Sequence, residues 1–430
     1  MTHSTGPFSL CAVGKFSAAT QFAQCVGQEA IAGLAGALKK VVCERLDVPL
    51  GVASKYTDGY ACCAARSIGP KTTCHPMSLI QSLPEGPLDI VGDIHGEFDA
   101  LLALLSHLGY DLQGHHPQGR TLVFVGDFCD RGPDSPAVLA LVQKLVQSGR
   151  AAAVLGNHEI NLLREDAKDG SGWFFDARVT RDHDKYAPFQ RPTPQERQDI
   201  VQFLSTLPIG LERADLRVIH AAWQDEQIEA ARRLPLGSVR AEYDQWEHIA
   251  QQQARETALA ERMARELEQW EHGLENSQRQ PPFLHAHAEY ESSKQMLNPL
   301  KVLTSGVEQK GAVPFFSGGK WRFAQRMPWW DAYTEATPVV VGHYWRRVHQ
   351  IDPGAVGKGD ADLFASTHPF AWHGQRGNVF CVDFSAGGRW LERKSGAVVG
   401  HDFKLAALRW PERVLQFDDG HVQATTGFGV

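Results

Sequence analysis

Three segments of the sequence repeat one pattern, in which a short apolar run ends at a glycine and polar residues follow directly. The apolar runs are 88–91, 121–125 and 151–155. Runs of this length predict buried strands, and apolar residues spaced by three and four positions after the first two runs predict amphipathic helices. Strands that alternate with helices predict an α/β fold, whose polar residues gather at the carboxyl edge of a sheet.

Two later apolar runs end at a histidine, His220 and His343. The 123 positions between these histidines indicate an insertion, which we expect to be mostly helical over about residues 225–330. Within it, one face of the stretch 241–273 is apolar and predicts a helix packed on the core. A mobile lid over the site is the alternative interpretation. The residues of this face are Leu259, Met263, Leu267, Trp270 and Leu274.

Composition restricts the class of protein. Hydrophobic residues make up 43% of the 430 positions and charged residues 22%, as in a globular protein with a sizeable core. A formal net charge of −7 gives no general attraction to nucleic acid or to anionic membranes, so we expect neither as a stable partner. No apolar run reaches the roughly 18 residues of a membrane span, and we expect a cytoplasmic protein.

The first 76 residues differ from the rest because they show weak periodicity and contain six of the eight cysteines. We interpret 1–76 as an extension that is disordered or not part of the functional chain, and 77–430 as the main domain. With two cysteines left, the main domain has no disulfide framework. A zinc site in the extension is disfavoured because its cysteine and histidine spacing does not match paired Cys-x-x-Cys patterns. That cluster is Cys62, Cys63, Cys74 and His75.

The polar residues at the strand ends have the chemistry of a two-metal site. Carboxylate, imidazole and amide oxygen suit borderline divalent or trivalent ions, and two such ions can clamp a phosphate for attack at phosphorus. A lone Asp or His at a strand end is usually a cap, so the inference rests on the combination. The candidates are Asp93, His95, Asp127, Asp130, Arg131, Asn157, His158, His220 and His343; the competing histidines are His115, His116, His285, His287 and His349.

These residues stand in the motifs GDIHG (92–96), GDFCDRG (126–132) and GNHE (156–159), followed by two later histidines. In this order the motifs resemble those of the calcineurin-like metallophosphoesterases of the phosphoprotein-phosphatase type. The resemblance implies a four-layer αββα sandwich of two mixed β-sheets, here with a helical insertion. It also implies a metallophosphoesterase domain over 77–430.

Carried over residue by residue, the resemblance assigns Asp93, His95 and Asp127 to one metal ion. It assigns the bridging Asp127 with Asn157, His220 and His343 to the second. The ions would be divalent or trivalent, with Mn favoured over Fe, Zn or Co.

The resemblance also assigns three catalytic residues. His158 matches the general acid, Asp130 the carboxylate that orients it and keeps it protonated, and Arg131 the phosphate-binding arginine. It implies a metal-dependent hydrolase in which a metal-bridging hydroxide attacks a phosphate ester.

The substrate is less constrained by the motifs. Leu155 stands where eukaryotic protein phosphatases have an arginine before GNHE, and the sequence looks more like bacterial members related to symmetrical diadenosine tetraphosphatase. We expect a small phosphomonoester or a nucleoside polyphosphate. A protein Ser/Thr or Tyr phosphatase acting on phosphoproteins and a non-catalytic protein that binds phosphorylated ligands are the alternatives.

Aromatic and basic residues close to the two later histidines leave further alternatives open. Trp223, Tyr344 and Trp345 could stack a nucleobase, although packing in the core is the favoured interpretation. Arg346 and Arg347 could reach a phosphate, but we expect them to be solvated charges.

Overall fold

Two mixed β-sheets lie at the centre of the fold, and the computed structural model describes them within residues 77–349, 359 and 361–429. All of these belong to one structural unit. The extension at 1–76, with its cysteine and histidine cluster, lies outside the described residues. Among the described cysteines, Cys129 and Cys381 are both buried and reduced.

The first sheet carries the three strands of the repeated pattern. β2, β3 and β4 are parallel, and β11 pairs antiparallel with β2 to begin the other half of the sheet. The order is β13 (Val422–Ala424), β12 (Val414–Phe417), β11 (Ala406–Trp410), β2 (Leu88–Val91), β3 (Thr121–Phe124), β4 (Ala151–Ala153).

The second sheet carries the two strands that precede the later histidines. β6 pairs in parallel with β9, and β9 in parallel with β10, whereas β5 and β6 are antiparallel. The order is β1 (Ile80–Ser82), β5 (Gly210–Arg213), β6 (Leu216–Ile219), β9 (Val339–Val341), β10 (Val379–Cys381).

Side chains that alternate along the strands fill the space between the sheets. Leu88 and Ile90 of β2 belong to one buried cluster with Val340 of β9 and Phe380 of β10. The opposite faces pack on helices, since Val91 shares a cluster with residues of α4 (Phe98–Leu108) and α5 (Ser135–Gln147). The predicted α/β sandwich of two mixed sheets is therefore confirmed.

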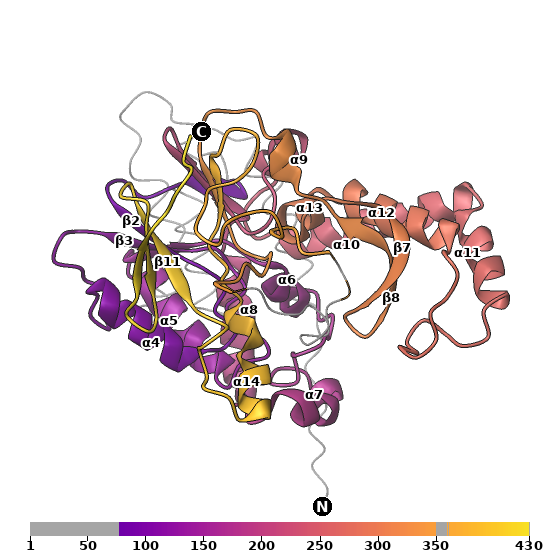
Figure 1. The fold of residues 1–430 in the computed structure, drawn as a ribbon, viewed down its shortest axis with the longest axis horizontal. Helices are drawn as coiled ribbons and strands as arrows, with labels where there is room; N and C mark the ends of the chain where they lie inside the picture. The colour runs from indigo at the N-terminus through magenta and orange to yellow at the C-terminus, as the bar shows by residue number, and fades with distance from the viewer. Residues whose placement is uncertain (1–76, 350–358, 360, 430) are drawn as a thin grey trace, which may run out of the picture. The chain divides into compact units, whose positions relative to one another are not determined.

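Helices cover the outer faces of both sheets. Figure 1 shows α4 and α5 side by side next to β2 and β3. No helix in the described part of the chain is both long and apolar enough to span a bilayer. Outside 225–330, the other helices in the described residues are α6 (Asn157–Leu163), α7 (Val179–Tyr186), α8 (Pro194–Ser205) and α14 (Arg389–Ser395), with short 3-10 turns at Asp176–Arg178 and Ala386–Gly388.

The stretch 225–330 contains helices and a long hairpin (Figure 1). The helix expected over 241–273 is split where Ala258 adopts a left-handed φ of 55°. Its apolar face contacts α12 through Leu259 and Met263 and not the main core, while Leu267 is exposed. The elements are α9 (Asp225–Arg232), α10 (Val239–Glu256), α11 (Leu259–Glu268), α12 (His285–Leu297), α13 (Pro299–Ser305), β7 (Glu308–Ser317), β8 (Lys320–Arg326) and a 3-10 turn at Trp329–Ala332.

A buried ion pair ties β2 to the segment before β3. Arg120 Nε donates to both carboxylate oxygens of Asp89, at 3.0 and 2.9 Å, and Tyr110 Oη donates to Oδ2 at 2.8 Å. Arg120 Nη2 also donates to the Leu88 carbonyl at 2.6 Å. Asp89 is fully buried, so its charge depends on these donors and on Arg409 Nε, which donates to Oδ1 at 3.2 Å.

We expect Arg120→Met to lower the free energy of unfolding by about 3 kcal/mol, because it leaves a buried carboxylate without its main cationic partner. Urea denaturation measures the change. Arg240→Met is the control, since Arg240 pairs with Glu165 on the surface, where such pairs contribute about 1 kcal/mol or less. Equal losses in the two variants would contradict the prediction.

Candidate metal centre and active site

The ends of five strands bring the predicted site residues together. Asp93 and His95 follow β2, Asp127 follows β3, and Asn157 opens α6 after β4. His220 directly follows β6, and His343 lies two residues after β9. The site therefore lies where the carboxyl ends of strands from both sheets meet.

Several of these residues sit in tight left-handed turns. The φ angles are 50° at His95, 51° at Asp127, 72° at Asp130, 70° at Arg131 and 70° at His343. This region is sparsely populated by residues other than glycine, and such conformations concentrate at functional sites. The turns project polar side chains out of the strand ends toward one another.

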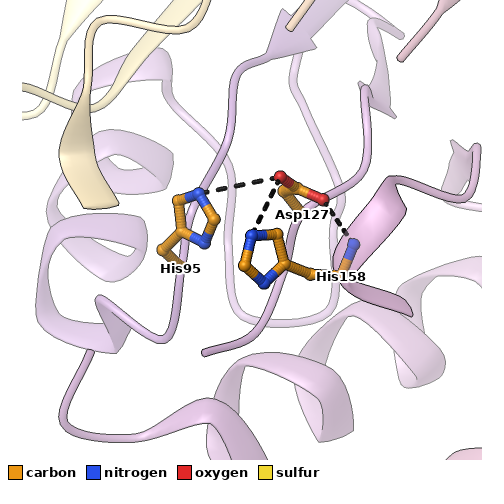
Figure 2. Close-up of side chains that lie close together, drawn as sticks. All are labelled: His95, Asp127 and His158. Atoms are coloured by element: carbon orange, nitrogen blue, oxygen red, sulfur yellow. Dashed lines mark hydrogen bonds and ion pairs between the residues drawn. The ribbon is translucent and has the colours of Figure 1, made fainter. Parts of the chain in front are cut away.

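Asp127 lies at the centre of the site (Figure 2). Its Oδ2 is 3.7 Å from His95 Nε2, 3.8 Å from His158 Nε2 and 3.4 Å from His220 Nε2. Two groups of ligand atoms within 4.8 Å of one another share it: one with His95 and His158, the other with His220 and His343. A single carboxylate thus faces two candidate cation positions.

Two imidazoles are oriented by backbone carbonyls so that Nε2 faces these positions. His95 Nδ1 lies 2.9 Å from the Cys129 carbonyl oxygen and His220 Nδ1 lies 2.8 Å from that of Val125. Because a carbonyl oxygen only accepts, each Nδ1 carries the proton and each Nε2 keeps a lone pair directed at the centre. Metal-binding histidines are oriented in this way.

Asp93 and Asn157 complete the candidate ligand set. Asp93 Oδ2 accepts from the His343 backbone N–H at 2.9 Å, whereas Asp93 Oδ1 and Asn157 Oδ1 are buried with no hydrogen-bond donor among the described residues. Burial, and then repulsion from Asp383 and Asp127, raise the pKa of Asp93 well above its usual range. Orphaned oxygens among crowded carboxylates fit a cation, so the residues present suit the metal ions that the motifs imply.

The pKa of Asp127 is shifted in the opposite direction to that of Asp93. Burial favours its neutral form, but the imidazoles of His220 and His158 hold the pKa of Asp127 well below its usual range. Asp127 is therefore the anionic member of the cluster.

His158, Asp130 and Trp173 form a chain of hydrogen-bonded side chains. Its Nδ1 donates to Asp130 Oδ2 at 2.5 Å, and Trp173 Nε1 donates to Asp130 Oδ1 at 2.6 Å. Asp130 and Trp173 are both buried. Trp173 was not among the candidates from the sequence, because nothing local to it indicates a contact 43 positions away.

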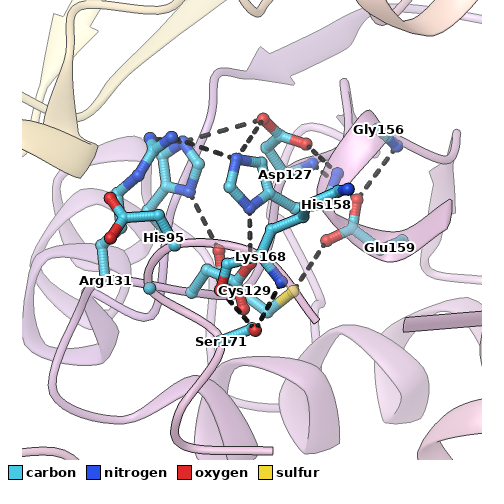
Figure 3. Close-up of polar contacts among 12 residues, drawn as sticks. His95, Asp127, Cys129, Arg131, Gly156, His158, Glu159, Lys168 and Ser171 are labelled. Atoms are coloured by element: carbon cyan, nitrogen blue, oxygen red, sulfur yellow. Dashed lines mark hydrogen bonds and ion pairs between the residues drawn. The ribbon is translucent and has the colours of Figure 1, made fainter. Parts of the chain in front are cut away.

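Arg131 bridges the two histidines of the first group (Figure 3). Its Nη1 is 2.9 Å from His95 Nε2 and its Nη2 is 3.1 Å from His158 Nε2. One lone pair cannot both accept this hydrogen bond and coordinate a metal ion. Metal binding at His95 therefore requires the guanidinium to turn away, toward the cavity that it lines.

Glu159 is a second residue whose role the sequence analysis missed. Its buried carboxylate accepts from the backbone N–H groups of Asp127 (2.8 Å), Phe128 (2.8 Å) and Gly156 (3.0 Å), and from Cys129 Sγ (Figure 3). Its place in the motif directly after His158 was the available signal. Glu159 fixes the turn that carries Asp127 against the start of α6.

The structure also places the aromatic and basic residues that lie close to the two later histidines. Trp223 and Tyr344 are buried in the core, as the packing interpretation predicts, whereas half-buried Trp345 lines the cavity. The expectation that Arg346 is solvated is wrong. Its guanidinium is buried between aromatic rings and donates to the carbonyls of His368 and Ala371, and burial lowers the pKa of Arg346 to about 10.

With this geometry established, comparison with known proteins identifies the family. The calcineurin-like phosphoesterase family matches residues 86–300, half of the chain. The chain belongs to this family. The resemblance inferred from the motifs is thereby confirmed, and the sandwich of two mixed sheets agrees with it.

Curated relatives match a shorter segment. The chain is 47% identical over 79 residues to the asymmetrical bis(5'-nucleosyl)-tetraphosphatase PrpE of Halalkalibacterium halodurans, covering 18% of this chain and 32% of that protein. It is 44% identical over 77 residues to the symmetrical bis(5'-nucleosyl)-tetraphosphatase of Ralstonia nicotianae, covering 18% and 24%. The chain thus spans a third or less of the length of these relatives.

A solved structure matches more of the chain at lower identity. The cold-active protein-tyrosine phosphatase of a Shewanella species is 19% identical, with a TM-score of 0.40 over 80% of this chain and 82% of that one.

We expect Mn²⁺ to raise the melting temperature of metal-stripped protein, because a cation relieves the repulsion among the buried carboxylates and binds the folded state only. At a metal concentration 100 times Kd the stabilisation would be about 2.7 kcal/mol. His220→Asn should lose most of this increment, whereas His107→Asn, at an exposed position on α4, should keep it. Differential scanning calorimetry measures the melting temperature of each variant with and without Mn²⁺. An equal rise in the two variants would argue against a metal ion at His220.

Proposed function

We propose that the protein is a dinuclear-metal phosphoesterase that hydrolyses small phosphorylated molecules, with nucleoside polyphosphates preferred. One observation carries the proposal: Arg131 and His158, whose ring Asp130 holds from behind, line the same cavity as Asp127, which is shared by two candidate metal groups. The cavity, of about 240 Å³, also includes Asn157 and His343 in its lining. Relatives named as nucleosyl tetraphosphatases favour a polyphosphate substrate.

The candidate ligands would be Asp93, His95 and Asp127 for one ion, and Asp127, Asn157, His220 and His343 for the other. When bound, two such ions supply Lewis-acid activation of water and neutralise charge on the phosphate. The number and identity of the ions, with Mn favoured, are part of the proposal.

Arg131 would bind the phosphate that is hydrolysed. Its guanidinium lines the cavity next to His158, and two parallel N–H groups match two phosphate oxygens. Engagement of phosphate would release His158 Nε2 from its present hydrogen bond with Arg131.

His158 would then protonate the leaving oxygen from Nε2. Asp130 accepts the Nδ1 proton, so the ring cannot present that nitrogen to substrate, and Nε2 is the nitrogen that faces the cavity. Trp173 keeps Asp130 in place as a positioning residue.

The proposal is tested by hydrolysis of p-nitrophenyl phosphate, bis-p-nitrophenyl phosphate and diadenosine tetraphosphate by metal-stripped protein resupplied with Mn, Zn, Fe or Mg. We expect metal-dependent turnover that falls at least about a hundredfold in Asp127→Asn, which removes the shared anionic ligand. Asp99→Asn, on the exposed face of α4, should retain wild-type rates. Absence of turnover with all substrates while metal binds would favour a phosphoprotein substrate or a non-catalytic role.

A second experiment isolates the general acid. His158→Asn should slow hydrolysis of glycerol phosphate, which has a poor leaving group, by about a hundredfold. Hydrolysis of p-nitrophenyl phosphate should slow much less, because p-nitrophenolate leaves without a proton. Equal slowing of the two substrates would show that His158 acts by another route, such as positioning the phosphate.

A further inference from the structure

The hairpin of the insertion reaches the cavity of the site. Ser317, Gly318, Arg322 and Arg326 line the same cavity as Asp127 and His158. None of the four belongs to the motifs from which the catalytic residues were predicted. Part of the cavity wall is therefore supplied by the hairpin and not by the motifs.

Strand alternation fixes which side chains face the cavity. Trp321 and Phe323 of β8 pack with Leu284 and Ala288, on the side of α12. Successive strand residues point to opposite faces, so Arg322 and Arg326 share the other face. The hairpin tip is a two-residue turn in which Gly318 and Gly319 have φ of 62° and 82°, as a type I′ turn requires.

The charges along the cavity are unevenly compensated. Lys185 is paired with Asp169 at 2.7 Å, whereas Arg326 and Arg322 both lie in the field of the half-buried Glu308 carboxylate. Arg322 is half-buried and forms no hydrogen bond or ion pair with the described residues. Its five N–H donors therefore remain available to a ligand in the cavity.

We propose that Arg322, supported by Arg326, binds phosphate groups beyond the one that is hydrolysed, so that the site prefers a phosphoanhydride chain to a phosphomonoester. This inference rests on the proposed function and specifies its substrate class. A monoester has one phosphate, and Arg131 is the residue proposed above to bind it. A polyphosphate chain carries additional anionic groups, and a planar guanidinium binds such groups through two parallel hydrogen bonds.

The test compares kcat/KM for diadenosine tetraphosphate with that for p-nitrophenyl phosphate. In Arg322→Gln the ratio of the two should fall about tenfold, mainly through KM for the tetraphosphate, as expected for loss of one charge-assisted contact. In Arg322→Lys the ratio should fall less, because lysine keeps the positive charge but lacks the two parallel N–H donors. Lys310→Gln removes one charge from the exposed side of the same hairpin and should leave the ratio unchanged.

Binding of inorganic tripolyphosphate, measured by calorimetry, tests the inference without turnover. Its affinity should weaken about tenfold in Arg322→Gln, whereas orthophosphate affinity should change less. If the wild-type protein hydrolyses none of the esters, the proposed function fails, and tripolyphosphate binding still decides whether the subsite exists.

Three outcomes would overturn the inference. Equal losses of kcat/KM for diadenosine tetraphosphate and for p-nitrophenyl phosphate would place Arg322 at the hydrolysed phosphate. If kcat/KM for both substrates and the affinity for tripolyphosphate were unchanged, Arg322 would not bind phosphate at this site. A larger loss for a phosphopeptide than for the tetraphosphate would assign the hairpin to phosphoprotein recognition.

Discussion

Asp127 joins the strand ends that form the site through both its backbone and its side chain. Its backbone carbonyl accepts from the N–H groups of Ile94 and His95, its N–H donates to Glu159, and its Oδ1 accepts from the His158 N–H. Its Oδ2 faces the histidines that follow β2, β4 and β6. The ends of strands from both sheets thus converge on one residue, and a change there alters geometry and charge together.

This convergence has an energetic cost that the surrounding structure offsets. Left-handed turns at non-glycine residues and buried carboxylates both disfavour the folded state. Glu159 stabilises the strained turn through three backbone N–H groups, although burial, and then the neighbouring Asp127, raise the pKa of Glu159. A bound cation would offset part of the remaining repulsion, which is why stability and metal binding should be coupled.

Local sequence patterns were sufficient to predict the strands that end at the site and the residues that follow them. The strand, glycine and polar residues of each motif are adjacent in sequence, so their placement at one edge needed no knowledge of distant contacts. Trp173 and Arg346 could not be assigned in this way, because the first acts through Asp130 and the second is buried by rings from remote segments. The split of the 241–273 helix at Ala258 likewise has no local glycine or proline to indicate it.

The separate origins of the motif residues and of the hairpin have a consequence for substrate choice. The strand ends supply groups that interact with one phosphate and its leaving oxygen, and such groups do not distinguish among the molecules to which that phosphate is attached. Discrimination requires contacts with the rest of the substrate, and in this cavity the side chains outside the motifs come from the hairpin, from Trp345, and from α7 and α14. Because β8 is held by α12 and not by the catalytic turns, its residues can change without disturbing Asp127. The insertion, more than the motifs, should therefore set which phosphorylated compound is hydrolysed.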